Sequence, residues 1–269
     1  MGYKLIALDV DGTIRSDEHP LSQATRTAIE KVHRAGAVVT LATGRMFTSA
    51  QAAALDVGIN GPIISSQGAH IANPISGDIL WHRPLTPAMA RDALHAIGDW
   101  QQEILAYHDD LVYVERLSPW VEAYGERNRG VVNLVESLEM LAEKMLTRLV
   151  LVGDETRVFN VYRQLTSSFG SELHVTRSLP HFCEILHSDA GKHNALAWLC
   201  KKVGARQDET VAFGNGYNDV DMLRWAGLGI AVSGAVSEVI QVADQVAPPL
   251  EEDGPASVME ELLRLGLIG

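Results

Sequence analysis

Residues 3–13 read Tyr-Lys-Leu-Ile-Ala-Leu-Asp-Val-Asp-Gly-Thr, a short apolar run that stops at two acids and a glycine. Such a run, ended by a turn, predicts a buried strand over residues 3–10. In open parallel sheets, ligands bind beyond the carboxyl ends of the strands, which is where Asp9 and Asp11 stand. Residues i and i+2 of an extended chain project to the same side, so both carboxylates are expected to face one pocket. The same residues also fit a strand-end turn in which Asp and Thr cap a helix.

Strands and helices alternate on both sides of a central region. The first block predicts helices at 21–35 and 46–57 and strands at 37–42 and 62–65. The last block predicts helices at 192–203, 219–226 and 256–265 and strands at 210–213 and 229–232. This alternation predicts the α/β class, with a Rossmann-like parallel sheet core and helices on both faces.

The central region has a different texture. Its predicted helices lie near 87–100, 137–144 and 156–168, and its predicted strands lie at 111–115, 148–152 and 181–187. Alternating strands between isolated helices are typical of an α+β unit with antiparallel pairing. We therefore predict a discontinuous core, residues 1–82 and 188–269, with a domain of residues 83–187 inserted in it.

Two further groups of polar residues adjoin predicted helix starts. Thr43 and Gly44 follow the second strand, where a hydroxyl and exposed N–H groups suit phosphate oxygens. A glycine-containing turn between strand and helix would look the same. Lys192 opens a helix, where the helix dipole disfavours a positive charge unless an anion is near. A solvated surface lysine is the plain alternative.

The segment Gly214-Asn215-Gly216-Tyr217-Asn218-Asp219 joins a strand to a helix and holds several oxygen-bearing side chains. One interpretation is a helix start with Asp219 near its N-cap. A dinucleotide-binding turn shares the first two glycines, but Asp219 stands where its third glycine belongs. That turn also belongs in the first βαβ unit, whereas this segment lies late in the chain. The shared position of all these groups at strand ends predicts one site.

Composition narrows the class of ligand. The chain has 269 residues, of which 46% are hydrophobic, enough for one large domain or two ordinary ones. Its 22 Lys and Arg against 34 Asp and Glu give a net charge of -12. That balance argues against nucleic acid and anionic membranes, but a local site for a small anion remains compatible with it. No signal-peptide pattern or apolar membrane span is recognised, so we expect a cytoplasmic protein.

Together these residues resemble the haloacid dehalogenase-like hydrolase superfamily, in particular its Cof-type branch with a large α/β cap. Residues 9–13 look like the nucleophile motif, 43–45 like the second motif, Lys192 like the third and 214–219 like the fourth. The loop 65–69, Ser-Ser-Gln-Gly-Ala, looks like one that usually reads Ser-Asn-Gly-Ala. The likeness covers the whole chain.

The resemblance implies a role for each matching residue. Asp9 would be the nucleophile and Asp11 the general acid and base. The substrate phosphate would be held by Val10, Thr43, Gly44, Lys192 and Asn218. Mg²⁺ would be bound by the Asp9 carboxylate and the Asp11 backbone carbonyl, with Asn215 and Asp219 of the fourth motif.

Two positions depart from the family pattern. The family usually has Asp at the position of Asn215, where it ligates the metal, so this chain lacks one negative charge there. Gln67 replaces the usual Asn in the loop before the cap.

The implied function is hydrolysis of small organic phosphate monoesters, such as sugar phosphates, by a magnesium-dependent phosphatase. Its intermediate would be an aspartyl-phosphate. Two alternatives stay open: a sugar-phosphate phosphomutase, and a phosphometabolite-binding protein with weak turnover. The expected partner is a small phosphorylated metabolite, and the expected state is a monomer or homodimer.

Overall fold

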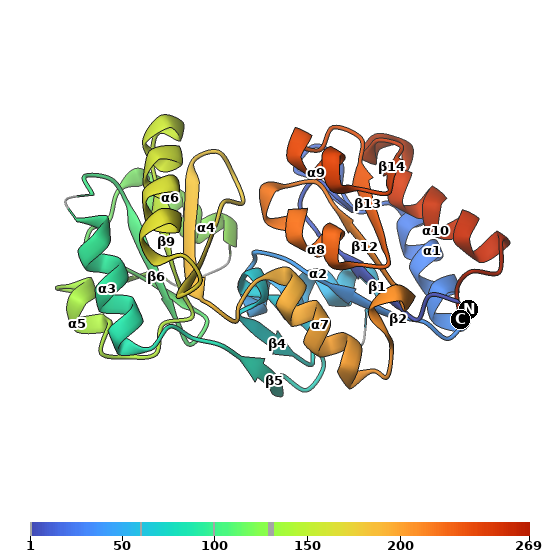
Figure 1. Ribbon diagram of the computed structural model, residues 1–269, viewed down its shortest axis with the longest axis horizontal. Coiled ribbons are helices and arrows are strands. Elements are labelled where there is room, and N and C mark those ends of the chain that lie inside the picture. The colour runs from blue at the N-terminus through green and yellow to red at the C-terminus, as the bar shows by residue number, and fades with distance from the viewer. Residues whose placement is uncertain (1, 60, 99, 129–131) are drawn as a thin grey trace.

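The computed structural model describes residues 2–59, 61–98, 100–128 and 132–269. Figure 1 shows two lobes side by side, and both termini lie in one of them. We call the lobe with the termini the core. The other lobe, which contains a sheet formed between residues 104 and 187, is called the cap.

The core contains a parallel sheet of five strands in the order β14-β13-β12-β1-β2. The strands are β1 (Leu5–Leu8), β2 (Val38–Leu41), β12 (Thr210–Gly214), β13 (Leu228–Val232) and β14 (Gln245–Ala247). Every residue of β1 and β12 is buried, as expected for central strands covered on both faces. The parallel sheet predicted from the sequence is confirmed.

Helices cover both faces of this sheet. Ile6 and Leu8 pack on the side of α1 (Gln23–Arg34), α2 (Phe47–Val57) and α10 (Gly254–Arg264). Leu5 and Ala7 face the opposite side, toward α7 (Lys192–Lys202), α8 (Val220–Trp225) and α9 (Ser237–Val242). Alternate residues of β1 therefore enter two separate apolar layers.

The strand predicted at 62–65 exists as β3 (Ile63–Ser65), but it is not a regular member of the parallel sheet. It touches the end of β2 through one parallel bridge between Ala42 and Ile64. Its main pairing is antiparallel, with β4 (His70–Ala72), which in turn pairs with β5 (Ile79–His82). The physical reason is the tight turn at 66–69, which sends the chain straight back beside β3.

The cap is built on a sheet of six strands in the order β10-β11-β9-β6-β7-β8. The strands are β6 (Ile104–His108), β7 (Leu111–Val114), β8 (Val132–Leu134), β9 (Arg148–Val152), β10 (Leu173–Thr176) and β11 (Phe182–His187). All neighbours are antiparallel except β7 and β8, which are parallel. The prediction of an inserted α+β unit is confirmed, while its borders at 82/83 and 187/188 stay a proposal.

The two faces of the cap sheet have different neighbours. One face packs on α3 (Pro87–Ile97) and α6 (Glu155–Phe169), with α5 (Leu138–Leu141) at its edge. The other face packs on α4 (Pro119–Asn128) and on Met46 of the core, so it is turned toward the core. The helix predicted at 137–144 is only the short α5, and the one predicted at 87–100 ends at Ile97, with residue 99 outside the described residues.

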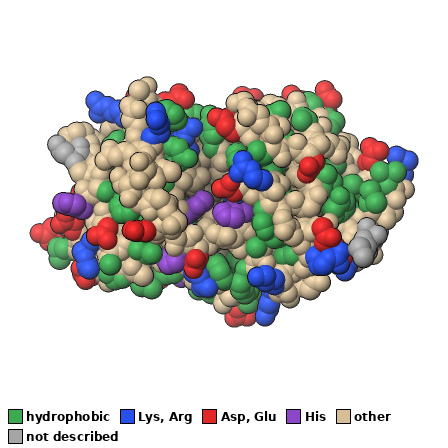
Figure 2. Space-filling model, in the orientation of Figure 1, with side chains coloured by type: hydrophobic (Ala, Val, Ile, Leu, Met, Phe, Trp, Pro, Cys, Tyr) green, Lys and Arg blue, Asp and Glu red, His purple; other side chains and the backbone are tan. Residues whose placement is uncertain are grey.

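The distribution of surface charge and the lengths of the helices are relevant to binding of nucleic acid and membranes. In Figure 2, acidic and basic side chains are interspersed over both lobes on the face shown. Within the described part of the chain, no helix is long and apolar enough to cross a membrane.

Candidate active site

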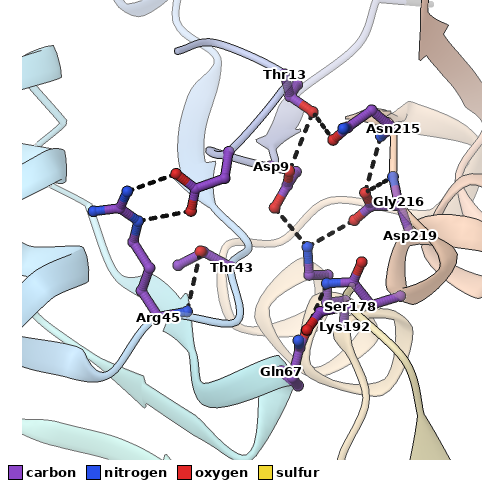
Figure 3. A network of polar contacts seen from close by, with 12 residues as sticks. Asp9, Thr13, Thr43, Arg45, Gln67, Ser178, Lys192, Asn215, Gly216 and Asp219 are labelled. Atoms are coloured by element: carbon purple, nitrogen blue, oxygen red, sulfur yellow. Dashed lines mark hydrogen bonds and ion pairs between the residues drawn. The ribbon is translucent and has the colours of Figure 1, made fainter. Parts of the chain in front are cut away.

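Asp9 lies at the carboxyl end of β1, and its side chain is buried, with 6% of the residue exposed. Its Oδ1 accepts a 2.6 Å bond from Lys192 Nζ, and its Oδ2 accepts a 3.2 Å bond from the Thr13 hydroxyl (Figure 3). The main chain holds it in register, because Asp9 N–H donates to the Phe213 carbonyl of β12 at 3.0 Å. The carboxylate therefore has a fixed position at the end of the sheet.

Lys192 is the first residue of α7 and reaches across the strand ends to two carboxylates. Its Nζ donates to Asp9 and, at 2.7 Å, to Asp219 Oδ1. Burial alone would lower the pKa of Lys192, but Asp219 and Asp9 raise it above its ordinary value, so the lysine is a cation. The buried anion expected beside this lysine is present in the form of these two side chains.

Burial has the opposite effect on the carboxylic acid. Desolvation, together with the charge of Asp219, raises the pKa of Asp9 to about 7, while Lys192 acts to lower it. A second cation beside Asp9 would favour its charged form further.

Asp219 organises the loop 214–219 rather than facing the open site. Its Oδ2 accepts 2.9 Å bonds from the N–H groups of both Asn215 and Gly216. A Cβ on Gly214 would lie 2.5 Å from the Asp219 Cβ, so only glycine leaves room for this turn. With Oδ1 on Lys192, both oxygens of Asp219 have partners, and its direct contact with a metal stays a prediction.

Oxygen atoms converge where the sequence predicts the metal. The Asn215 carboxamide atom nearest to Asp9 lies 3.2 Å from Asp9 Oδ2 and 3.0 Å from the Asp11 carbonyl oxygen. In the orientation drawn, that atom is the amide oxygen, which accepts a 2.9 Å bond from the Thr13 hydroxyl, and the three oxygens leave room for a cation between them; in the reversed orientation the NH₂ group would stand there and donate to the same neighbours. Octahedral Mg²⁺ holds its ligands at about 2.0–2.1 Å, which places adjacent oxygens about 3 Å apart. The donor set therefore fits magnesium.

The charge of that donor set is low. Among the residues that the structure describes, no group of three or more His, Cys, Asp or Glu side chains is arranged to hold a metal ion. The site would instead consist of one carboxylate, one backbone carbonyl and one carboxamide. Gly12, with φ of +83°, makes this possible, because a Cβ there would lie 2.2 Å from the Asn215 side chain.

The Asp11 carboxylate points toward the second motif. Arg45 donates to it through Nε at 2.8 Å and Nη2 at 2.5 Å, a bidentate pair. The side chain of Asp11 is 56% exposed, so it stands at the mouth of the site and not in its floor. Bonding to Asp11 raises the pKa of Arg45, which is partly buried.

The predicted phosphate-binding residues surround Asp9 in different ways. Thr43 is buried, and its hydroxyl accepts a 3.2 Å bond from Arg45 N–H. Gly44 lies under the side chain of Gln67, and Asn218 donates to the same side chain at 2.9 Å. The Val10 side chain lies in the apolar core, so a phosphate would meet only its main chain.

Two hollows differ in their relation to this site. One of about 270 Å³ lies between the lobes and is lined by Met46, Ser66 and His70 of the core and by Tyr107 and Thr147 of the cap. The other, of about 360 Å³, lies between α1 and α10 and contains none of the predicted site residues. The first is not lined by a predicted site residue either, but Met46 directly follows the second motif and Ser66 directly precedes Gln67, so it adjoins the loops that surround the site.

Several residues with close contacts here were not assigned a role from the sequence. Thr13 and Arg45 stand inside quoted motifs, so their motifs were the available signal. Glu184 lies within an apolar run of β11, where a buried charge is itself unusual. Two of its partners, Gln67 and Arg148, come from distant segments, which a single sequence does not reveal.

Comparison with known proteins adds an independent result. Residues 6–259 match the family model described as haloacid dehalogenase-like hydrolase. The chain is 27% identical to the 5-amino-6-(5-phospho-D-ribitylamino)uracil phosphatase YitU of Bacillus subtilis, over 97% of this chain and 98% of that protein. It is 26% identical to the HMP-PP phosphatase of Cronobacter sakazakii, over 88% and 86%. The crystal structure of BT1666 from Bacteroides thetaiotaomicron superimposes with a TM-score of 0.82, at 27% identity, over 97% of this chain and 95% of that one.

Proposed function

Because the chain belongs to the haloacid dehalogenase-like hydrolase family, as a Cof-type phosphatase acting on small phosphorylated metabolites, we propose that it hydrolyses phosphate monoesters through an aspartyl-phosphate at Asp9. One observation carries the proposal. A buried carboxylate at a strand end is held by a buried lysine and lies beside the Asn215 carboxamide, which also approaches the Asp11 carbonyl oxygen. Such a carboxylate is positioned to attack rather than to form a surface ion pair.

The role of Lys192 follows from electrostatics. A carboxylate approaching a phosphate brings like charges together, and two unit charges at 4 Å repel by roughly 4 kcal/mol at an effective dielectric constant of 20. The Lys192 ammonium already contacts Asp9 and offers a positive charge to an incoming phosphate oxygen. Phosphoryl transfer gains most from this kind of positioning and charge neutralisation.

The remaining residues have roles in holding the phosphate and in moving protons. Thr43, Gly44, Asn218 and the Val10 main chain would surround the phosphate oxygens. Asp11 would protonate the leaving alkoxide and later take a proton from the attacking water. Its position at the mouth of the site, beside Arg45, supports a function at the leaving-group side.

The metal proposed here is Mg²⁺, held by the Asp9 carboxylate, the Asp11 carbonyl and Asn215. When bound, it would neutralise charge on the transferring phosphoryl group.

The substrate we propose is a small phosphate monoester, such as a sugar phosphate or a phosphorylated heterocycle. The hollow of about 270 Å³ between the lobes supports an organic group of modest size. Two relatives are named for phosphatase activity on small metabolites, which supports the same class. A cytoplasmic location and a monomeric or homodimeric state stay predictions.

Phosphate release across a panel of phosphorylated sugars, short acids and cofactors tests the proposal. We expect activity with magnesium, its loss with a chelator, and its loss in Asp9→Asn. Activity that survives in Asp9→Asn would contradict the covalent route. Binding of esters without release would favour the phosphometabolite-binding alternative, which the missing charge at Asn215 motivates.

A further inference from the structure

Gln67 lies where three parts of the site meet. Its backbone is in the left-handed region, with φ of 56°, and only 1% of the residue is exposed. Its N–H donates to the Thr43 carbonyl at 3.1 Å, and its carbonyl accepts from Gly191 N–H at 3.0 Å. The main chain of Gln67 is therefore tied both to the second motif and to the residue before Lys192.

Gly44 leaves room for the side chain of Gln67, and Gly68 leaves room for the main chain of Gly191 beside it. A Cβ on Gly44 would lie 2.4 Å from Gln67 Nε2. A Cβ on Gly68 would lie 2.2 Å from the Gly191 carbonyl oxygen, so the next residue is also packed too closely for a side chain. The Gln67 side chain can therefore extend from the core to the cap because no side chain occupies the position of Gly44.

Two hydrogen bonds run through that carboxamide. Gln67 Nε2 donates to Glu184 Oε1 of the cap at 2.7 Å. Gln67 Oε1 accepts from Asn218 Nδ2 of the core at 2.9 Å. Gln67 therefore connects Glu184 of the cap with Asn218 of the core (Gln67 is labelled in Figure 3).

The charge of Glu184 sets the direction of this chain. An ionised carboxylate only accepts hydrogen bonds, so Gln67 must present its NH₂ group to it. The oxygen of Gln67 then faces Asn218, which must in turn present its own NH₂ group. Asn218 Oδ1 is turned to the other side, where it lies 2.7 Å from the position of a Cβ on Gly216. The remaining N–H of Asn218 is left as a donor, which is what a phosphate oxygen requires.

Glu184 is held in the cap by strong partners. Arg148, 3% exposed, donates to its Oε2 at 2.7 Å, and the Ser178 hydroxyl donates to its Oε1 at 2.5 Å. Arg148 also lies over the Tyr107 ring, 4.2 Å from its centre. Burial would lower the pKa of Arg148, but Glu184 and Tyr107 raise it, so the guanidinium is charged and forms an ion pair with Glu184. The position of Glu184 is therefore determined by the cap and not by the core.

We propose that Glu184 is a positioning residue that orients the Asn218 carboxamide through Gln67, so that docking of the cap completes the phosphate pocket in the core. The inference rests on the proposed function, because it takes Asn218 as a phosphate-binding residue. It assigns the cap a second task besides covering the substrate: the cap fixes the polarity of a group that contacts the phosphate. Removing the Glu184 charge lets both carboxamides turn over.

We call the chain of hydrogen bonds from Glu184 through Gln67 to Asn218 the relay. A double-mutant cycle on the full chain tests it. The probe is inorganic phosphate, titrated by calorimetry in the presence of magnesium into wild type, Glu184→Gln, Asn218→Ala and the double variant. Glu103→Gln is the matched control, because Glu103 is a cap carboxylate paired with Arg116 at 3.5 Å and makes no hydrogen bond to Gln67 or Asn218. Circular dichroism and thermal unfolding show whether each variant is folded.

We expect Glu184→Gln to weaken phosphate binding about tenfold, the effect of losing roughly one well-oriented hydrogen bond to a charged group. In the Asn218→Ala background the same change should have almost no effect, since the group that it orients is gone. The control should bind phosphate as wild type does. Equal weakening in both backgrounds, or none in either, would overturn the relay.

A second variant keeps the test valid if Glu184→Gln does not fold. Gln67→Met has a similar length but makes neither hydrogen bond, and it leaves Glu184 with Arg148 and Ser178 as partners. It should weaken phosphate binding as Glu184→Gln does, and again only when Asn218 is present; unchanged binding would overturn the relay. If wild type binds phosphate but the effects of the Glu184 and Asn218 substitutions are additive, only the proposed role of Glu184 is contradicted. Wild type that neither binds phosphate nor hydrolyses any ester contradicts the proposed function as well.

Discussion

At the scale of single residues, the site is defined by a small group of buried charges. Asp9, Lys192 and Asp219 are all at most 6% exposed, and one ammonium group lies between two carboxylates. Isolated charges are costly to bury, and removing one partner leaves another uncompensated. With both carboxylates ionised the cluster has a net charge of one negative unit, which suits a site that also receives a divalent cation.

We propose that Asn215 influences how strongly that cation is bound. We expect Asn215→Asp to tighten magnesium binding in the substrate-free protein by about 1–2 kcal/mol, because a carboxylate adds a full negative charge to the ligand set. Calorimetric titration of magnesium into both proteins measures it. Equal affinities would show that position 215 does not touch the metal.

At the scale of secondary-structure elements, a cap residue forms hydrogen bonds with the first residues of the core helix α2. The N-cap of α2, Met46, makes no side-chain cap bond of its own. Asp110, in the turn between β6 and β7, accepts from the N–H groups of Phe47 and Thr48 at 2.7 Å each, and also from the Thr48 hydroxyl. A cap residue thus acts as the N-terminal cap of a core helix, directly after the second motif.

Asp110→Ala should lower the free energy of unfolding by about 1 kcal/mol, the usual effect of losing a helix N-cap. Urea unfolding measures the change. Asp109→Ala is the control, because Asp109 lies in the same turn with its side chain 77% exposed. If the two variants lose stability equally, the hydrogen bonds of Asp110 to α2 do not contribute measurably to the free energy of unfolding.

We expect a second meeting point of cap and core to depend on pH. His174 of β10 lies 6.1 Å from His193 of α7, ring centre to ring centre. Burial, with a contribution from His193, lowers the pKa of His174 to about 4, against the opposing charges of Asp221 and Glu184. Its ordinary value of 6.5 applies in the unfolded chain.

The folded protein therefore binds the His174 proton less readily than the unfolded chain does. Stability from the neutral ring is fully present above pH 6.5 and is lost as the pH falls toward about 4. Its size is at most about 3 kcal/mol. His174→Gln should flatten the pH dependence of urea unfolding between about pH 7.5 and pH 4.5. An unchanged slope would contradict this assignment.

The elements recovered from the sequence share one property. β1, β2 and β12 are apolar runs buried on both faces, so each gave a strong local signal. The strands missed from the sequence include β5, β8 and β14, which are short and partly exposed. β4, β6 and β10 were missed as well, although β6 is a buried, mostly apolar run, so this local signal does not recover every strand. The motif residues could be placed because strand ends of one parallel sheet must meet. Gln67 and Glu184 could not be paired, since their contact depends on how the cap is seated on the core.

At the scale of the whole molecule, two segments join the lobes. Arg83 stacks on Trp81 at 3.6 Å from its ring centre and approaches Asp189 of the return segment at 3.6 Å. The two segments therefore run close together, which suits a hinge. The contacts of Asp110 and Glu184 with the core belong to a closed cap.

Opening about this hinge should separate those contacts. We expect the angle between cap and core to differ between protein alone and protein with a phosphate mimic, as measured by small-angle scattering. Cap substitutions that spare Glu184 should alter substrate ranking more than magnesium affinity. One fixed arrangement in both states would argue against a moving cap.

The most direct test of the account is detection of the covalent intermediate. Asp11→Asn should slow the hydrolytic step, because the proposed general base is lost, while phosphorylation from an ester with a good leaving group continues. This variant, mixed with magnesium and such an ester and quenched in acid, is digested and analysed by mass spectrometry. We predict one added phosphoryl group on the peptide that contains Asp9, and none when Asp9→Asn is also present. Turnover without a labelled peptide, or a label on another residue, would contradict the proposal that Asp9 is the nucleophile.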